Sequence, residues 1–117
     1  MKQLKCFVHF ICLLYYVIFI NIIFFAEALR KYAPMGWLDR IAATDYRIDD
    51  SLTIEAGTVV YINVNGMHFD SEYFPDPDRF DPDRFLPENE KDIEPYSYLP
   101  FGEGPRFCIG KIGLAIL

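Results

Sequence analysis

Acidic side chains are missing from the first 25 residues of this 117-residue chain, and basic side chains are scarce throughout. All 17 Asp and Glu lie in residues 26–117, where nine Lys and Arg leave a net charge of −8. Binding to nucleic acid depends mainly on attraction to phosphate, for which this charge has the wrong sign. We therefore expect the acidic part to be a poor nucleic-acid binder and nucleic acid not to be a partner. The composition divides the chain into an apolar segment at 1–25 and an acidic part at 26–117.

Cysteine is also scarce: Cys6 and Cys12 lie in the apolar segment, and Cys108 lies near the other end. An odd number in so uneven a distribution is not a disulfide framework. The acidic part therefore carries one free thiol, which suits a reducing compartment or a metal site. This part is also too short and too acidic to bury a large apolar core, and we expect the chain to be incomplete.

The apolar segment contains an uncharged run from Phe7 to Phe25. As a helix it would extend about 28 Å, close to the hydrocarbon thickness of a bilayer, which favours a membrane anchor. A signal peptide is the alternative, because two lysines precede the run and the Ala-Glu-Ala sequence at 26–28 has the pattern of a cleavage site. A third interpretation is a mistranslated intron, since the residues that dominate the run have AT-rich codons.

The remaining sequence predicts short elements separated by loops. A helix at 27–32 ends before Pro34, because the residue before a proline is pushed out of the helical region. The β-branched and aromatic residues of 58–64 favour a strand. Two tandem copies of DPDRF, at 76–80 and 81–85, indicate a loop. The other expected elements are a strand, an Asp-Asp-Ser turn and a second strand within 47–57, one helical turn within 68–74, and a helix from Gly110 onward.

Glycine, proline and arginine crowd around Cys108 in the sequence FGEGPRFCIG. A cysteine that binds a metal must be a thiolate, and the N–H groups at the start of a helix lower the pKa of a thiol placed there. Gly102 and Gly104 are able to take positive φ and turn backbone amides toward the sulfur. A buried cysteine in a simple turn is the alternative, but it does not explain the whole pattern.

The neighbours of Cys108 narrow the choice of metal. Gly110 has no side chain, so a flat ligand can lie against the backbone, and Phe101 can shield the sulfur from water. Arg106 offers a positive charge to a carboxylate of the ligand. Zinc would require several protein ligands, whereas this loop supplies one, so the pattern favours haem iron.

Five residues of this loop, Phe101, Gly104, Arg106, Cys108 and Gly110, together resemble the haem-binding signature of the cytochrome P-450 family. They match every fixed position of the pattern F-x-x-G-x-R-x-C-x-G. The resemblance implies that Cys108 is the axial ligand of the haem iron and that the other four bind the cofactor or shape its loop. The surrounding sequence is most similar to the insect microsomal branch.

Two further motifs in the expected order support this resemblance. Glu27-x-x-Arg30 resembles the E-x-x-R pair of the family's K helix, and Pro-Asp-Arg-Phe at 82–85 resembles the meander element whose arginine completes a Glu-Arg-Arg network. By this pattern Arg84 is the network arginine, and Arg79, in the first DPDRF copy, is a solvated surface charge. An exposed i,i+3 pair is the simpler alternative for Glu27 and Arg30.

Two other residues match family positions. Arg40, within WLDRI, matches a position that often meets a haem propionate, as Arg106 does. His68 follows the strand expected at 58–64 and matches a frequent family residue. We interpret it, as a lone histidine, as structural and leave it out of the site.

The resemblance implies a fragment of the mainly α cytochrome P-450 fold, with residues 26–117 as part of the haem-binding domain. As it stands, the chain is expected to be α+β, with an apolar N-terminal helix, a K-helix remnant, a small β-sheet, the meander loop, the cysteine-ligand loop and the start of the next helix. The implied activity is insertion of one oxygen atom into a small apolar organic substrate. Haem is the implied cofactor, and electrons come from NADPH through a reductase. The implied location is the cytosolic face of the endoplasmic reticulum membrane.

The segments that in this family cover the other face of the haem and contact the substrate are not among these 117 residues. We therefore expect the chain by itself to be inactive as a monooxygenase. The competing class is a small membrane-tethered or secreted acidic protein without haem, for which cleavage after Ala28 would separate Glu27 from Arg30. A remnant that binds haem weakly through Cys108 is a third class.

Overall fold

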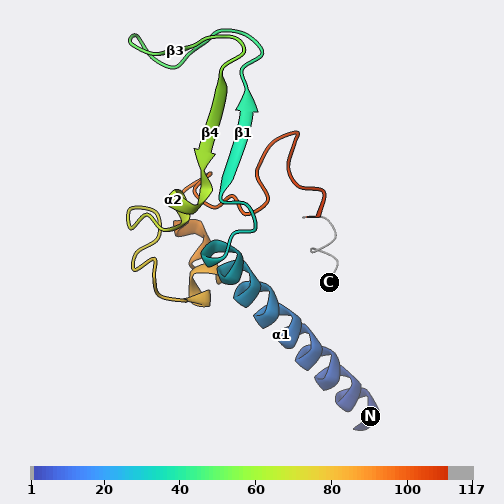
Figure 1. Ribbon diagram of the computed structural model, residues 1–117. Helices are drawn as coiled ribbons and strands as arrows, with labels where there is room; N and C mark the ends of the chain where they lie inside the picture. The colour runs from blue at the N-terminus through green and yellow to red at the C-terminus, as the bar shows by residue number, and fades with distance from the viewer. Residues whose placement is uncertain (1, 111–117) are drawn as a thin grey trace.

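The computed structural model describes residues 2–110 of the chain. The chain has one long helix, two pairs of short antiparallel strands and a second, short helix. The short helix and the loops that follow it lie around the end of the long helix, whereas the strands extend away from it (Figure 1). The elements are α1 (Lys2–Lys31), β1 (Trp37–Ile41), β2 (Tyr46–Arg47), β3 (Thr53–Ile54), β4 (Val59–Asn63), α2 (Val64–His68) and two 3-10 turns, η1 (Pro82–Phe85) and η2 (Glu90–Asp92).

The helix α1 is continuous, so the apolar N-terminal helix and the helix expected at 27–32 are parts of one element. Residues 2–31 contain neither proline nor glycine, and nothing in the backbone favours a break near residue 25. The helix ends at Lys31, and Tyr32 N still donates to Ala28 O at 2.8 Å. The predicted end before Pro34 is confirmed.

Most of α1 projects away from the rest of the chain (Figure 1). Its side chains from Leu13 to Phe25 are largely exposed, and Ile23 is the buried exception in this stretch. The stretch Cys12–Lys31 is long and apolar enough to cross a membrane, a criterion that signal sequences and buried helices also meet. The helix is therefore compatible with an anchor and with a signal peptide.

The strand predicted at 58–64 is confirmed as β4, which pairs with β1 in antiparallel register. Opposite residues include Leu38 with Ile62 and Arg40 with Val60. Because side chains alternate between the two faces of a strand, these four share one face. The other face is exposed, and its apolar side chains are Trp37, Ile41, Val59 and Tyr61.

The expected strand–turn–strand unit within 47–57 is confirmed as the short pair of β2 and β3. Asp49 closes its turn. The carboxylate accepts hydrogen bonds from Ser51 Oγ and Ser51 N, both at 2.7 Å, and from Leu52 N at 2.9 Å. These bonds, that of the Ser51 hydroxyl first, lower the pKa of Asp49 because they favour its charged form.

The short helix α2 begins at Val64, directly after β4, and the sequence prediction, which has no helix there, is wrong for these residues. Asn63 caps α2, since its side-chain oxygen accepts from Gly66 N at 2.8 Å. A glycine within a five-residue helix weakens the local helix signal, which explains the error. The helical turn expected within 68–74 is confirmed, since Phe74 N donates to Asp70 O at 2.9 Å with the i→i+4 spacing of a single helical turn.

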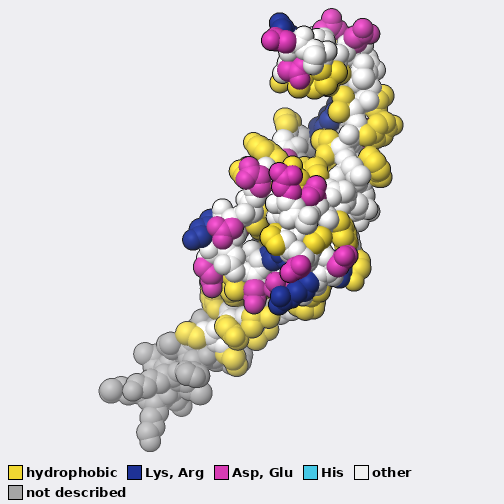
Figure 2. All heavy atoms as spheres, turned by 90° about the vertical axis from the view of Figure 1, so that its left-hand side faces the viewer, with side chains coloured by type: hydrophobic (Ala, Val, Ile, Leu, Met, Phe, Trp, Pro, Cys, Tyr) yellow, Lys and Arg dark blue, Asp and Glu magenta, His cyan; other side chains and the backbone are white. Residues whose placement is uncertain are grey.

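Among the described residues the buried core is small, and half of its members are polar. The apolar members are Ile23, Val64, Phe74 and Leu99, and the polar members are Glu27, Arg30, His68 and Ser97. A buried polar group without a partner destabilises a fold by about 1–3 kcal/mol, so this core depends on satisfied hydrogen bonds. Many acidic side chains lie on the surface outside this core (Figure 2).

Candidate functional site

Glu27 and Arg30 lie one turn apart at the end of α1, and both side chains are fully buried. Arg30 Nε donates to Glu27 Oε2 and Arg30 Nη2 donates to Glu27 Oε1, both at 2.8 Å. Glu27 Oε1 also accepts from Asp81 N at 2.9 Å. Two parallel hydrogen bonds fix the relative orientation of guanidinium and carboxylate. The alternative of an exposed surface pair is therefore wrong.

The remaining N–H groups of Arg30 bind backbone carbonyls of two distant segments. Nη1 donates to His68 O at 2.6 Å, and Nη2 donates to Pro77 O at 2.7 Å and to Arg79 O at 3.3 Å. The guanidinium also lies 5.4 Å from the ring centre of Phe74, within the range of a cation–π contact. Arg30 therefore fastens α2 and the DPDRF loop to the end of α1.

The two arginines of the DPDRF copies lie in different surroundings. Arg84 Nε is 3.9 Å from Glu27 Oε1, and Arg84 Nη2 donates to Asp76 O at 3.0 Å. The Arg84 side chain is 13% exposed, and its Nε has no hydrogen-bond partner within the described residues. The Arg79 side chain is 70% exposed, and this residue contributes its backbone carbonyl to Arg30. The network consists of a tight Glu27–Arg30 pair and a looser third member.

His68 completes this buried network, although the sequence interpretation left it out of the site. Its Nε2 accepts from Leu99 N at 3.0 Å, and its Nδ1 lies 3.1 Å from Arg30 O. A backbone N–H only donates, so Nε2 is unprotonated and the Nδ1 proton is donated to Arg30 O. These partners are 31 and 38 residues away in the sequence, so no local pattern reveals them.

The surroundings of His68 keep its ring neutral. Burial is the main cause that lowers the pKa of His68, and the positive charge of Arg30 acts in the same direction. The hydrogen bond to the Arg30 carbonyl acts against both. The net direction is downward, so the neutral form that accepts from Leu99 N is favoured.

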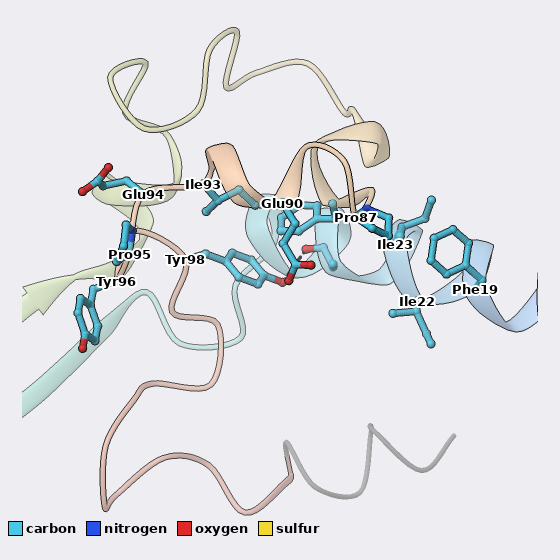
Figure 3. Close-up of a pocket in the computed structure, with 12 residues that line it drawn as sticks. Phe19, Ile22, Ile23, Pro87, Glu90, Ile93, Glu94, Pro95, Tyr96 and Tyr98 are labelled. Atoms are coloured by element: carbon cyan, nitrogen blue, oxygen red, sulfur yellow. Dashed lines mark hydrogen bonds between the residues drawn. The ribbon is translucent and has the colours of Figure 1, made fainter.

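Tyr98 packs beside His68 and reaches the same helix. The two rings stack with centres 5.5 Å apart, and the Tyr98 hydroxyl donates to Ala26 O at 2.9 Å. Burial, followed by the negative charge of Glu27, raises the pKa of Tyr98. Tyr98 also lines a mostly apolar cavity of about 460 Å³ between α1 and segment 85–98 (Figure 3). The hydrogen bond from the Tyr98 hydroxyl to Ala26 O ties the residue before Leu99 to α1.

The segment from Phe101 to Gly110 turns back on itself. Cys108 N donates to Phe101 O at 2.8 Å. Gly102 and Gly104 have φ of +69° and +82°, the region that the sequence analysis expects glycine to adopt here. Cys108 is exposed. The helix expected from Gly110 onward lies, beyond this residue, outside the described residues.

The glycines at positions 102 and 110 show how much space surrounds the Cys108 thiol and its loop. A Cβ atom at Gly110 would lie 3.4 Å from Cys108 Sγ, so the missing side chain keeps that side of the thiol open. A Cβ atom at Gly102 would lie 3.6 Å from Leu38, so the loop passes along β1. Arg40 stands two residues from Leu38 on the same face of β1, which is therefore the face toward the loop.

Comparison with known proteins identifies the family to which the chain belongs. The family model "Cytochrome P450" matches residues 23–117. Cytochrome P450 6l1 of Blattella germanica is 46% identical over 91 residues, which cover 76% of this chain and 18% of that protein. Probable cytochrome P450 6d5 of Drosophila melanogaster is 53% identical over 85 residues, which cover 72% and 16%.

The chain belongs to the cytochrome P450 family, and it is similar to insect members, so the predicted resemblance is confirmed. A further relative, Probable cytochrome P450 6a13 of Drosophila melanogaster, is 46% identical over 101 residues, covering 79% of this chain and 20% of that protein. The chain thus spans about a fifth of the length of the curated relatives that it matches. The α+β arrangement is consistent with a piece of the family fold.

Family membership implies haem as the cofactor, and the residues around Cys108 fit it. No group of three His, Cys, Asp or Glu able to hold a metal ion occurs in the part of the chain that the structure describes. Haem iron requires a single cysteine ligand from the protein on this side, and Cys108 is able to supply it. The open side of the thiol at Gly110 leaves room for a flat ligand, and Arg106 is an exposed cation nearby in the sequence.

Proposed function

We propose that this chain forms the cysteine-ligand side of the haem site of a monooxygenase. The observation that carries the proposal is the setting of Cys108. It is exposed on a loop whose turns use the positive φ of Gly102 and Gly104. The loop is joined through Leu99 to a fully buried network. A buried network behind an accessible thiol would support a single cysteine ligand of haem iron.

In this role Cys108 binds the iron as a thiolate. Phe101, which is half-buried, limits the access of water, and the open position at Gly110 accommodates the flat cofactor. Arg106 and Arg40 are exposed cations that bind the propionates by charge and hydrogen bonding. Bound haem supplies the activation of O₂ through which one oxygen atom is inserted into a small apolar substrate. The electrons come from NADPH through a reductase partner.

The network of Glu27, Arg30 and Arg84 supports this loop without touching the cofactor. In family terms, the end of α1 is the K helix, and the loop with the DPDRF copies is the meander. Hydrogen bonds support this assignment. Arg30 donates to His68 O at the end of α2 and to Pro77 O in the DPDRF loop. Glu27 accepts from Asp81 N in the same loop. These contacts hold together segments that lie far apart in the sequence.

The proposed location is the endoplasmic reticulum membrane, with residues 26–117 on the cytosolic face. Residues 1–25 contain the membrane segment, which ends before the buried Ile23, and residues 26–117 are part of the haem-binding domain. Glu27 and Arg30 are buried at the end of the same continuous helix, so no linker separates the membrane segment from the body. The body then lies directly at the membrane surface.

The test is a titration of the full chain, in detergent micelles, with ferric haem. The variant C6S/C12S keeps Cys108 as the remaining thiol, and C6S/C12S/C108S is its matched control. After reduction under carbon monoxide, the first variant is expected to give the red-shifted Soret band of a thiolate-ligated haem, and the control is expected to lack it. Equal spectra would refute the assignment of Cys108 and would favour the acidic protein without haem.

A further inference from the structure

His68 joins three parts of the chain. It is the last residue of α2, its side chain is fully buried, and its ring lies between the end of α1 and the backbone of Leu99. The Arg30 carbonyl that it binds belongs to the last turn of α1, where carbonyls lack partners within the helix. The ring therefore satisfies one group that would be orphaned in α1 and one in the segment leading to Cys108.

The two ring nitrogens cannot exchange these tasks. Leu99 N is a donor, so it requires an unprotonated Nε2, and Arg30 O is an acceptor, so it requires a protonated Nδ1. One tautomer of the neutral ring satisfies both, and the doubly protonated ring breaks the contact with Leu99. The positions of Arg30 O and Leu99 N therefore fix which tautomer the His68 ring adopts.

Leu99 connects this constraint to residues 101–110, which we call the cysteine loop. Its carbonyl accepts from Gly102 N at 3.2 Å, which fixes the first turn of the loop, and Phe101 O accepts from Cys108 N at 2.8 Å. Hydrogen bonds therefore run from Arg30 O through His68 and Leu99 to the residues that hold the backbone of Cys108. No other side chain of the described residues is found to bind Leu99 N.

We propose that His68 is a positioning residue for the cysteine loop, because it couples the end of α1 to Leu99 and so sets where the loop begins. This inference rests on the proposed function of Cys108 as a haem ligand. The coupling itself is a property of the chain and does not require the cofactor. Its failure can therefore be told apart from failure of the haem assignment.

The charged and titratable groups that face the His68 ring are few. Arg30 lies on α1, and Tyr98 stacks on the ring from the loop side, with Glu27 behind Arg30. Phe74 meets the ring edge-on, with centres 6.1 Å apart. Burial and the Arg30 charge lower the pKa of His68, which agrees with a neutral ring in this position. No carboxylate contacts the ring directly among the described residues.

Two variants separate the two hydrogen bonds of the ring. An Asn at this position presents its N–H₂ near the place of Nδ1, so H68N keeps the donor to Arg30 O and loses the acceptor for Leu99 N. A Gln presents its oxygen near the place of Nε2, so H68Q keeps the acceptor for Leu99 N and loses the donor to Arg30 O. The readout is hydrogen–deuterium exchange of the full chain in micelles, resolved at the amides of Leu99 and Cys108.

The expected result is that H68N exchanges about tenfold faster than wild type at the amides of Leu99 and Cys108, as loss of one buried hydrogen bond implies. H68Q is expected to keep both amides close to wild-type protection, with faster exchange near the end of α1. Unchanged protection in H68N would overturn the proposal, as would equal loss in H68Q.

A second measurement decides the matter if either variant does not fold. In the wild-type chain, ¹⁵N chemical shifts of the His68 ring identify the protonated nitrogen. The proposal requires the proton on Nδ1 and a neutral ring at pH 7. A proton on Nε2, or a doubly protonated ring, would overturn it, because neither form accepts from Leu99 N.

Discussion

Arg30 and His68 exchange hydrogen bonds in both directions. The guanidinium Nη1 donates to His68 O at 2.6 Å, and the His68 ring Nδ1 lies 3.1 Å from Arg30 O, to which it donates. Each residue thus uses its side chain to bind the backbone of the other. The exchange joins a buried ion pair on α1 to the segment that leads to Cys108, so stability of the network and position of the loop are linked.

Removal of Glu27 is expected to destabilise the chain strongly. Glu27→Ala leaves the buried Arg30 without its carboxylate, and breaking a buried pair in this way costs about 3–5 kcal/mol. The measurement is the free energy of unfolding by urea, followed by tryptophan fluorescence. Arg47 and Asp50 provide a matched i,i+3 pair that is exposed, so Asp50→Ala should change stability little. Similar losses in the two variants would contradict the role of burial.

The two DPDRF copies offer an internal comparison. Arg84→Ala removes a nearly buried side chain, its hydrogen bond to Asp76 O and a positive charge near Glu27. We expect a loss of about 1–2 kcal/mol of unfolding free energy. Arg79→Ala keeps the backbone carbonyl that binds Arg30 and removes a mostly exposed side chain, so the expected loss is below about 0.5 kcal/mol. A larger effect of Arg79→Ala would reverse the assignment.

Neutral His68 makes stability depend on pH. Its pKa is lowered from the ordinary value of 6.5 in the folded chain, so the unfolded chain binds a proton more readily. The stabilisation is fully present above pH 6.5 and is lost progressively as the pH falls below this value. The check is urea unfolding at pH 8 and pH 5, where wild type should lose more stability than His68→Gln. An equal pH dependence in the two proteins would exclude His68 as the titrating group.

Positive φ at Gly104 predicts a local effect on the cysteine loop. A Cβ atom there meets nothing within 4 Å, so Gly104→Ala tests backbone strain alone, which costs about 1–2 kcal/mol. Gly57 is the matched control, with φ of +85° and equally open space, in a turn away from Cys108. Both variants should lose similar global stability, whereas faster exchange at the Cys108 amide is expected for Gly104→Ala alone. Faster exchange of the Cys108 amide in both variants would contradict a local effect of Gly104 on this loop.

Sequence reasoning succeeded where the signal was local. The β-branched residues of β4 predict a strand, and Asp49 and its neighbours predict the turn between β2 and β3. The end of α1 follows from Pro34. The positive φ of Gly102 and Gly104 follows from the conformational freedom of glycine. Family motifs brought Glu27 and Arg30 to notice, because spacing alone favoured an exposed pair.

The remainder depends on contacts between distant segments. The strand β1 carries Asp39 and Arg40 in its centre, and it becomes a strand because β4 pairs with it. Ordinary loop residues, such as Pro77 and Arg79, bind Arg30 through carbonyls that every residue has. His68 and Leu99 meet across 31 residues, so the histidine has no distinguishing local pattern. These features emerge from tertiary packing.

The most direct test of the central claim is to identify the protein atom that ligates the haem iron, which we propose is Cys108 Sγ. X-ray absorption at the iron K-edge should be recorded on the haem-loaded C6S/C12S chain in its ferric state. The account predicts one sulfur scatterer bonded to iron, which C6S/C12S/C108S lacks. A first shell of nitrogen and oxygen alone in the chain that retains Cys108 would contradict the account.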